Sequence, residues 1–268
     1  MNMPSWNPGQ YLKFAGERSR PCCDLAAQVY VPDAKRIIDL GCGPGNSTEV
    51  VARRWPNAEI IGFDSSAQMI ESARNSQPGK RWVVGDISQW AAGASSEPAL
   101  EDPFDLVFSN AALQWVPDHA ELLPRLLARL NPGGALAIQV PGNFDSPAHE
   151  LMREIAISPT WYRSFPPGKV REWHVHDLPF YYDVLAPTAE RVDFWETEYL
   201  HVMDNAEAIV EWYKGSGLRP FLDALATDED RARFTAEYLD GITGMYAARD
   251  NGKVLFPFRR LFLIAYAP

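Results

Sequence analysis

Hydrophobic positions in the first half of the chain fall into short runs that alternate with segments of helical spacing. The runs have the length of strands and cover residues 36–40, 59–63, 81–84, 104–108 and 135–140. Between them, apolar residues recur with the helical period over residues 47–55, 67–74 and 120–130. Repeated β-α units of this kind predict a parallel sheet with helices on both faces.

The pattern changes after residue 140. Up to about residue 187 the chain is rich in Pro, Trp, Tyr and His and has no clean period. Residues 190–203 then alternate like a strand, 228–248 have helical spacing, and 260–266 form a final apolar run. Together these patterns predict an α/β fold with a doubly wound, mostly parallel, seven-stranded, Rossmann-like sheet and helical insertions that form a lid.

A single domain over residues 1–268 is expected, because this length suits one large core that carries insertions. In chain order we expect N-terminal cap helices at 1–30, a cofactor-binding core at 31–140, lid or substrate insertions at 141–189 and 204–250, and closing strands at 190–203 and 253–268.

Charge and cysteine content narrow the function classes. The formal net charge of -10 argues against a nucleic-acid-binding protein, since such binding needs clustered Lys and Arg. No apolar stretch is long enough to predict a membrane span, and the 3 cysteines lack the spacing of a zinc or redox site. We therefore expect a cytoplasmic protein with a small-molecule substrate and no nucleic-acid or membrane partner; its oligomeric state stays open.

A glycine-rich turn follows the first predicted strand, with the sequence Asp39-Leu-Gly41-Cys-Gly43-Pro-Gly45-Asn46. In doubly wound sheets such a turn lets the backbone approach a ligand, and the next helix offers its N-terminus to an anion. The glycines stand at every second position, whereas the dinucleotide fingerprint is G-x-G-x-x-G, which disfavours an oxidoreductase that uses NAD or FAD. Asn46 or Ser47 is expected to cap the helix.

Acidic residues end the next two predicted strands. Asp64 ends the second strand, where an acidic side chain commonly accepts hydrogen bonds from ribose hydroxyls. Asp86 ends the third strand, where it can accept from an exocyclic amine while the backbone N–H of Ile87 faces a ring nitrogen. The glycine-rich turn alone could be an ordinary tight turn, but with both acidic residues in register it predicts a nucleotide-like ligand.

These motifs resemble those of the class I S-adenosylmethionine-dependent methyltransferases, and the resemblance covers residues 35–140. It implies S-adenosylmethionine as the cofactor, with Gly41, Cys42 and Gly43 along its methionine moiety. Asp64 would then hold the ribose, and Asp86 with Ile87 the adenine. The other implied cofactor contacts are Gln10, Tyr11, Arg20, Asp39, Asn46, Ser65, Met69, Asn110, Ala111 and Trp115.

Segments outside this core sharpen the resemblance. Residues 6–21, 109–119 and 217–220 look like those of members that methylate a carboxylate of a small tricarboxylic acid, which implies a carboxyl O-methyltransferase with a monomethyl ester as product. The alternative acceptors are another small acid or the carboxylate of a carrier-protein-bound acyl group. A protein that binds S-adenosylmethionine without catalysis is the alternative from another class.

A carboxylate acceptor sets physical requirements for the site. It is ionised at neutral pH, so its attack on a sulfonium methyl needs no general base, and no catalytic residue is assigned. The carboxylates that do not react need cations, and Arg binds them with its forked guanidinium. The substrate-binding candidates are Arg18, Trp115, His119, His174, Tyr181, Tyr182, Arg219 and Arg260. For each Arg the competing interpretation is a surface ion pair, and for the rings it is packing.

His174 and His176 stand beside Glu172 and Asp177, and all four residue types bind metals. No third His lies near them in the sequence, and they fall in the predicted lid, so we expect no metal site. The functional alternative for either His is a hydrogen bond to a substrate carboxylate.

Overall fold

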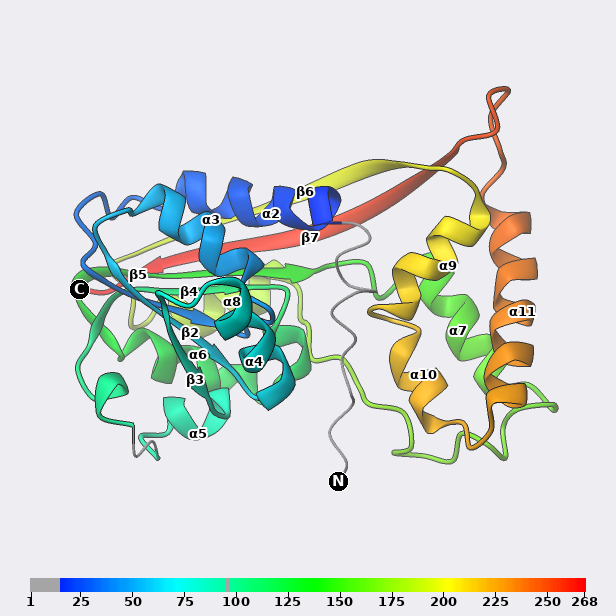
Figure 1. Ribbon diagram of the computed structural model, residues 1–268, viewed down its shortest axis with the longest axis horizontal. Helices are drawn as coiled ribbons and strands as arrows, with labels where there is room; N and C mark the ends of the chain where they lie inside the picture. Colours follow the sequence, from blue (N-terminus) through cyan, green and yellow to red (C-terminus); the bar gives the residue numbers. More distant parts are fainter. Residues whose placement is uncertain (1–14, 95–96) are drawn as a thin grey trace.

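A seven-stranded sheet with strand order β3-β2-β1-β4-β5-β7-β6 forms the centre of the computed structural model, which describes residues 15–94 and 97–268 (Figure 1). Strands β1 to β5 are parallel, and β7 is antiparallel to both of its neighbours. The bounds are β1 Arg36–Leu40, β2 Glu59–Asp64, β3 Arg81–Val84, β4 Phe104–Asn110, β5 Leu130–Pro141, β6 Arg191–Met203 and β7 Val254–Tyr266. The predicted fold class is confirmed.

Strand order reverses between β1 and β4, which are hydrogen-bonded neighbours although β2 and β3 lie between them in sequence. In open α/β sheets, ligands bind beyond the carboxyl ends of the strands at such a reversal. The glycine-rich turn after β1 and the segment after β4 therefore meet at the position where this fold binds ligands.

Helices cover both faces of the sheet and bury separate apolar clusters. On one face, α2 (Ala15–Gln28) and α3 (Asn46–Arg54) pack on residues of β1, β4, β5 and β7. On the other, α5 (Ile87–Ala91), α6 (His119–Leu127) and α8 (Leu178–Leu185) contribute to the largest cluster. Helix α4 (Ala67–Ser76) packs against β2 and β3, where Ile70 and Ala73 meet Trp82.

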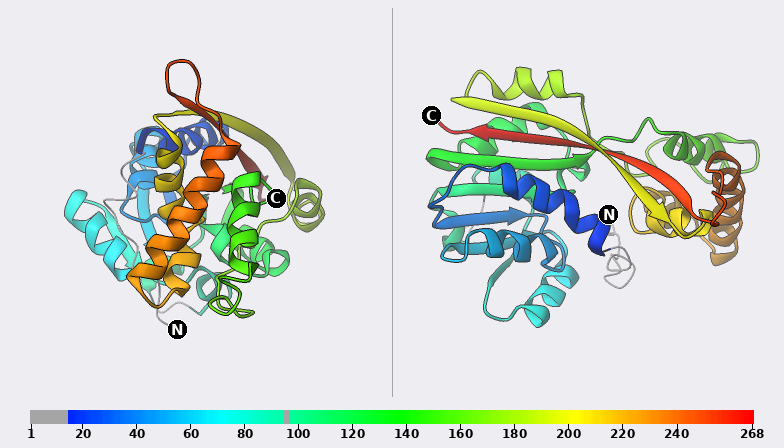
Figure 2. Two further views of the ribbon diagram at one scale, coloured as in Figure 1. Left: turned by 90° about the vertical axis from the view of Figure 1, so that its right-hand side faces the viewer. Right: turned by 90° about the horizontal axis from the view of Figure 1, so that it is seen from above.

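A second, helical lobe lies at the far ends of β6 and β7, away from the rest of the sheet (Figures 1 and 2). It consists of α7 (Pro147–Ile157), α9 (Ala206–Lys214), α10 (Arg219–Ala224) and α11 (Asp228–Met245). Its core joins these helices to Met203 of β6 and to Val254, Phe256 and Phe258 of β7. The two longest strands therefore belong to both cores and connect the lobes.

Two segments differ from the sequence expectation. The stretch 141–187, which has no clean period, contains α7 and α8, and α8 packs on the sheet through Tyr181 and Leu185 instead of joining the helical lobe. Strand β5 begins at Leu130, five residues earlier than expected. Leu130 pairs with Phe104 of β4 and Ala135 pairs with Leu106, so β5 has a bulge between Leu130 and Ala135. Gly133, with φ 73°, lies inside that bulge.

None of the helices within the described ranges 15–94 and 97–268 is both long and apolar enough to cross a membrane.

Candidate functional site

The turn between β1 and α3 has glycine at each position where the backbone enters the left-handed region. Gly41, Gly43 and Gly45 have φ of 69°, 55° and 98°, which side chains other than glycine rarely adopt. The backbone N–H groups of Gly41 and Cys42 both donate to the carbonyl of Phe63 in β2, at 2.7 and 3.2 Å. A Cβ at Gly41 would stand 2.1 Å from the Cβ of Ala112, so the turn also packs tightly against the segment after β4.

Asp39 lies beneath this turn, fully buried, and does not line the cavity that the turn borders. Its Oδ2 accepts hydrogen bonds from the hydroxyls of Ser47 and Thr48, at 2.7 and 2.6 Å. Its Oδ1 has no hydrogen-bond partner among the described residues. Burial raises the pKa of Asp39 to about 6, with the hydroxyl donors opposing the shift and Asp64 adding to it.

The N-terminus of α3 differs from the expected cap. Gly45 is the N-cap residue, and no side chain in the described part of the chain caps the helix. Ser47 donates to Asp39 instead, and Asn46 lines the cavity. The first backbone N–H groups of α3 are therefore left for a ligand.

Asp64 and Asp86 lie at successive strand ends and are both held by backbone N–H groups. Asp64 accepts from the N–H of Gly43 at 2.9 Å and of Ser66 at 2.8 Å, and burial raises its pKa. Asp86 caps α5 by accepting from the N–H of Gln89 at 3.0 Å. Each carboxylate still has acceptor capacity for a ligand.

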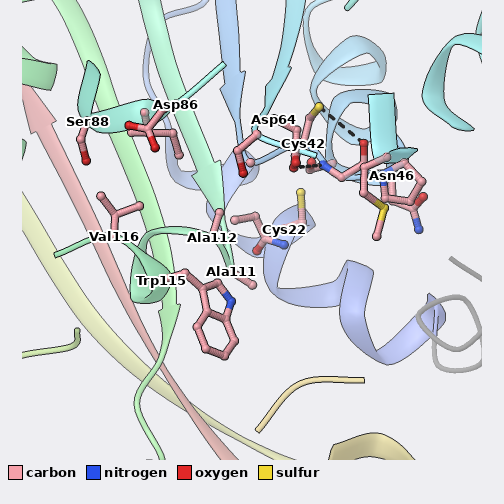
Figure 3. Close-up of a pocket in the computed structure, with 18 of the residues that line it drawn as sticks. Cys22, Cys42, Asn46, Asp64, Asp86, Ser88, Ala111, Ala112, Trp115 and Val116 are labelled. Atoms are coloured by element: carbon pink, nitrogen blue, oxygen red, sulfur yellow. Dashed lines mark hydrogen bonds between the residues drawn. The ribbon is translucent and has the colours of Figure 1, made fainter. Parts of the chain in front are cut away.

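A cavity of about 210 Å³ opens at these strand ends (Figure 3). In Figure 3, Asp64, Cys42 and Asn46 lie on one side, Asp86 and Ser88 on the other. Its lining includes these residues of the sequence prediction: Gly41, Cys42, Gly43, Asn46, Asp64, Ser65, Met69, Asp86, Ile87, Asn110, Ala111 and Trp115. Lining residues that the sequence prediction did not include are Ser19, Cys22, Pro44, Ser47, Ser88, Ala112, Val116, Pro117 and Arg171.

The segment after β4 supplies one wall of this cavity. Asn110 lines the cavity with a buried Oδ1 that has no partner among the described residues. Ala111 is one of the non-glycine residues with positive φ, at 55°, and its N–H donates to the carbonyl of Gln139 at 2.8 Å. The following 3-10 turn, Leu113–Trp115, places Trp115 in the cavity lining.

Trp115 also borders a smaller cavity of about 30 Å³, whose lining includes His149 of α7, Tyr213 of α9 and Phe258 of β7. There the ring of His149 packs edge-on against Trp173 and Tyr213, with centroids 5.4 and 4.9 Å away. Burial lowers the pKa of His149 to about 3, so this ring is neutral at physiological pH. Trp115 therefore lines both cavities and lies between the sheet and the helical lobe.

The N-terminal candidates are only partly described. Gln10 and Tyr11 lie outside the described residues, and so does the side chain of Arg18 in α2. Arg20 is exposed on α2, with its guanidinium carbon 5.1 Å from the centre of the Tyr199 ring, and it does not line the cavity.

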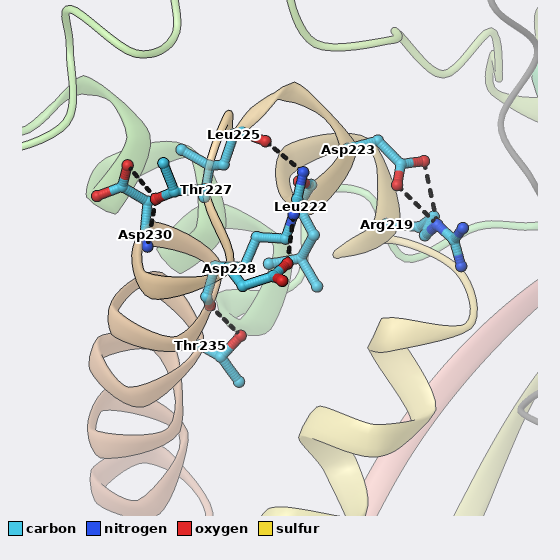
Figure 4. Close-up of polar contacts among 9 residues, drawn as sticks. Arg219, Leu222, Asp223, Leu225, Thr227, Asp228, Asp230 and Thr235 are labelled. Carbon is cyan, nitrogen blue, oxygen red and sulfur yellow. Dashed lines mark hydrogen bonds and ion pairs between the residues drawn. The ribbon is translucent and has the colours of Figure 1, made fainter.

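Arg219 and Arg260 line neither cavity. Arg219 begins α10 and forms an ion pair with Asp223 of the same helix, at 2.9 Å (Figure 4). Arg260 is buried in β7, with its guanidinium carbon 4.6 Å from the centre of the Phe258 ring. Whether an arginine lines a cavity depends on its tertiary neighbours, which the sequence pattern does not show.

His119 and Tyr181 contact each other and not a cavity. The Nδ1 of His119 is 3.0 Å from the Tyr181 hydroxyl, and its Nε2 is 3.0 Å from the carbonyl of Leu113. Tyr182 points away from this pair and is exposed, near Phe194. His174 lines neither cavity, but its backbone N–H donates to the carbonyl of Gln114 at 2.8 Å. Among the described residues, no group of three His, Cys, Asp or Glu side chains is arranged to hold a metal ion.

Solved structures share this fold at low sequence identity. The YcgJ protein from Bacillus subtilis aligns with a TM-score of 0.56 at 13% identity, covering 92% of this chain and 98% of that one. A phosphoethanolamine N-methyltransferase 2 from Haemonchus contortus, in complex with S-adenosyl-L-methionine, aligns with a TM-score of 0.55 at 16% identity, covering 97% of this chain and 56% of that one. These likenesses show the fold.

Relatives of much higher identity span the whole chain. A family model described as a methyltransferase domain matches residues 14–208. A protein named trans-aconitate 2-methyltransferase from Azoarcus sp. (strain BH72) is 49% identical, over 98% of this chain and 99% of the relative. One of the same name from Variovorax paradoxus (strain S110) is 47% identical, over 98% of both chains. The chain thus belongs to the trans-aconitate 2-methyltransferase family, within the S-adenosylmethionine-dependent methyltransferases that its motifs resemble.

Proposed function

We propose that this protein transfers the methyl group of S-adenosylmethionine to a carboxylate of trans-aconitate, giving a monomethyl ester and S-adenosylhomocysteine. The observation that carries the proposal is the 49% identity to a relative named for this reaction, over 98% of the chain. The net charge of -10 favours a small molecule over nucleic acid as the acceptor.

The larger cavity has the chemical groups that S-adenosylmethionine requires. Asp64 would accept from the ribose hydroxyls, and Asp86 from the adenine amine beside the N–H of Ile87. The uncapped N-terminus of α3 suits the methionine carboxylate, and the unpartnered Oδ1 of Asn110 suits its ammonium group. The lining carboxylates favour a sulfonium cation by charge. When bound, the cofactor supplies an electrophilic methyl group on a positively charged sulfur.

Residues of this chain would contribute positioning and water exclusion. A trans-aconitate carboxylate is already ionised at neutral pH, so it attacks without losing a proton to a base. Burial lowers the pKa of both His119 and His149, which makes each imidazole a weak base. Neither ring is therefore assigned a role in proton transfer. Trp115 would form the apolar wall against which the acceptor is aligned with the methyl group.

A methyl-transfer assay against a panel of acids tests this proposal. Labelled S-adenosylmethionine is incubated with the protein and with trans-aconitate, cis-aconitate, citrate or a dicarboxylate such as itaconate. We expect the highest kcat/KM with trans-aconitate. Faster transfer to a different acid would replace the acceptor and keep the reaction class. Transfer to none of them would leave a carrier-bound carboxylate or simple cofactor binding as the function.

A further inference from the structure

Arg171 is the only positively charged side chain that lines the larger cavity in the part of the chain that the structure describes. The other ionisable groups of that lining are the carboxylates of Asp64 and Asp86 and the thiols of Cys22 and Cys42, whose pKa burial raises well above the usual value. Those carboxylates suit a cationic cofactor, but they repel a polyanionic acceptor. An acceptor with several carboxylates therefore needs a cation at its own end of the cavity, and Arg171 stands there beside Trp115.

Arg171 is an exposed residue whose guanidinium is oriented by two contacts with Trp115. Its central carbon is 4.8 Å from the centre of the Trp115 ring, and its Nη2 donates to the Trp115 carbonyl at 3.0 Å. Its own segment is tied to the same turn, since the N–H of His174 donates to the carbonyl of Gln114 at 2.8 Å. Stacking and one hydrogen bond fix the plane of the fork, and several of its N–H donors remain for a ligand.

No carboxylate among the described residues forms an ion pair with Arg171. In contrast, Arg219 pairs with Asp223, and Arg259 pairs with Asp145, each at 2.9 Å. Arg171 instead contacts an aromatic face and a carbonyl, neither of which neutralises its charge. Within the described ranges, Arg171 is therefore a positive charge without an anionic partner, in a cavity whose carboxylates are those of Asp64 and Asp86.

We propose that Arg171 binds a non-reacting carboxylate of the methyl acceptor and thereby selects polyanionic acids, an inference that rests on the proposed methyl transfer to trans-aconitate. A forked pair with a spectator carboxylate anchors the acceptor on Trp115. It also leaves the reacting carboxylate away from the guanidinium, which would otherwise lower its nucleophilicity. Arg171 is therefore a specificity-determining residue, with no part in proton transfer.

The test compares the wild type with R171Q, R171K and the control R163Q. Arg163 also stacks on an aromatic ring, that of Tyr162 at 5.6 Å, but lines neither cavity. Steady-state methyl transfer gives kcat and KM for trans-aconitate and for the dicarboxylate itaconate. Calorimetry without acceptor gives the Kd of S-adenosylmethionine, and the melting temperature checks that each variant is folded.

For R171Q we expect the KM for trans-aconitate to rise by about tenfold or more, as for the loss of a charge-assisted hydrogen-bonded pair. The Kd of S-adenosylmethionine should stay within about twofold of the wild-type value. The preference for trans-aconitate over itaconate should shrink, R171K should recover part of it, and R163Q should match the wild type.

Different results would overturn different claims. An unchanged KM for trans-aconitate in R171Q, with the wild type active, would overturn the role of Arg171 and leave the proposed function intact. A lower kcat and a weaker Kd of S-adenosylmethionine, with the acid preference unchanged, would show that Arg171 only supports the Trp115 turn. A wild type that methylates no acid would overturn the proposed function and this inference together.

Discussion

Asp39 carries a buried negative charge directly under the glycine-rich turn, with two hydroxyl donors on one oxygen and no described partner on the other. Folding raises its pKa from 3.8 to about 6, so the folded state takes up a proton at higher pH than the unfolded state. The contribution of Asp39 to the free energy of unfolding must therefore increase as the pH falls from about 6 towards 3.8.

This predicts a pH-dependent difference between the wild type and D39N. Asn can still accept from Ser47 and Thr48 but does not titrate, so subtracting its unfolding free energy removes the contributions of the other groups. Denaturant unfolding at pH 7 and pH 5 should show the wild type gaining about 1 kcal/mol relative to D39N at the lower pH. A difference that stays constant, or that changes in the other direction, would contradict a raised pKa at Asp39.

Gly43 separates two reasons for glycine in the turn. A Cβ at Gly43 would meet no atom within 4 Å, but Gly43 itself lines the larger cavity. Gly168 also has positive φ, 76°, and an open surrounding, and it lies outside both cavities. G43A and G168A should each lower the free energy of unfolding by about 1 kcal/mol, because both force alanine into the left-handed region.

Only G43A should weaken S-adenosylmethionine binding, by more than about tenfold in calorimetry, since its methyl group occupies ligand space. Equal affinities for the two variants would argue that the cofactor does not approach this turn.

At this scale, sequence reasoning succeeds where a residue type is required by the backbone. Gly41, Gly43 and Gly45 were predicted to form a tight turn after the first strand, and each has a positive φ. Arg171 was not predicted, because it lies in a segment without period and its role depends on the distant ring of Trp115. Conversely, Arg219 and Arg260 were candidates because Arg binds carboxylates, and Arg219 also stands in the resembling segment 217–220, but neither lines a cavity.

Among the elements, α8 is fastened to the segment after β4 by a chain of hydrogen bonds. The Leu113 carbonyl accepts from Nε2 of His119, which leaves Nδ1 to accept from the Tyr181 hydroxyl. That hydroxyl in turn accepts from the N–H of His176 at 3.2 Å. Helix α8 thus supports the turn that carries Trp115.

Removing the Tyr181 hydroxyl should therefore destabilise the protein. Y181F removes the hydrogen-bond partner of the buried His119 Nδ1 and of the His176 backbone N–H. It should cost about 1 to 3 kcal/mol in the free energy of unfolding, measured by denaturant titration. The adjacent Tyr182 is 53% exposed, and its ring contact to Phe194 would be retained by Phe. Y182F should change stability by less than about 0.5 kcal/mol. Equal effects of the two substitutions would refute the structural role of Tyr181.

The elements show where periodicity is informative. Apart from the early start of β5, the strands and helices that were predicted between residues 36 and 140 lie close to their observed bounds, because each strand is an apolar run and each helix has one apolar face. The short helix α5 was not predicted. Helix α8 was predicted only as part of the lid insertion at 141–189. Its sequence, LPFYYDVL, is apolar on most sides and gives no helical stripe. Its packing between α6 and β6 is a tertiary property that the local pattern does not encode.

At the scale of the whole molecule, β6 and β7 contribute to two apolar cores, while the larger cavity lies at the carboxyl ends of β1 to β4. The sheet lobe supplies the acidic side chains of the larger cavity, Asp64 and Asp86. The segment before α8 supplies Arg171, and the helical lobe supplies His149 beside the smaller cavity. This arrangement separates the groups that suit a cation from those that suit a polyanion, as a methyl transfer between two such molecules requires.

The most direct test of the account is a product analysis with the purified protein, S-adenosylmethionine and trans-aconitate. Mass spectrometry would measure the amounts of S-adenosylhomocysteine and of methylated acid after several turnovers. The account predicts trans-aconitate monomethyl ester and S-adenosylhomocysteine in a one-to-one ratio. S-adenosylmethionine that binds but yields no methyl ester with trans-aconitate would contradict it.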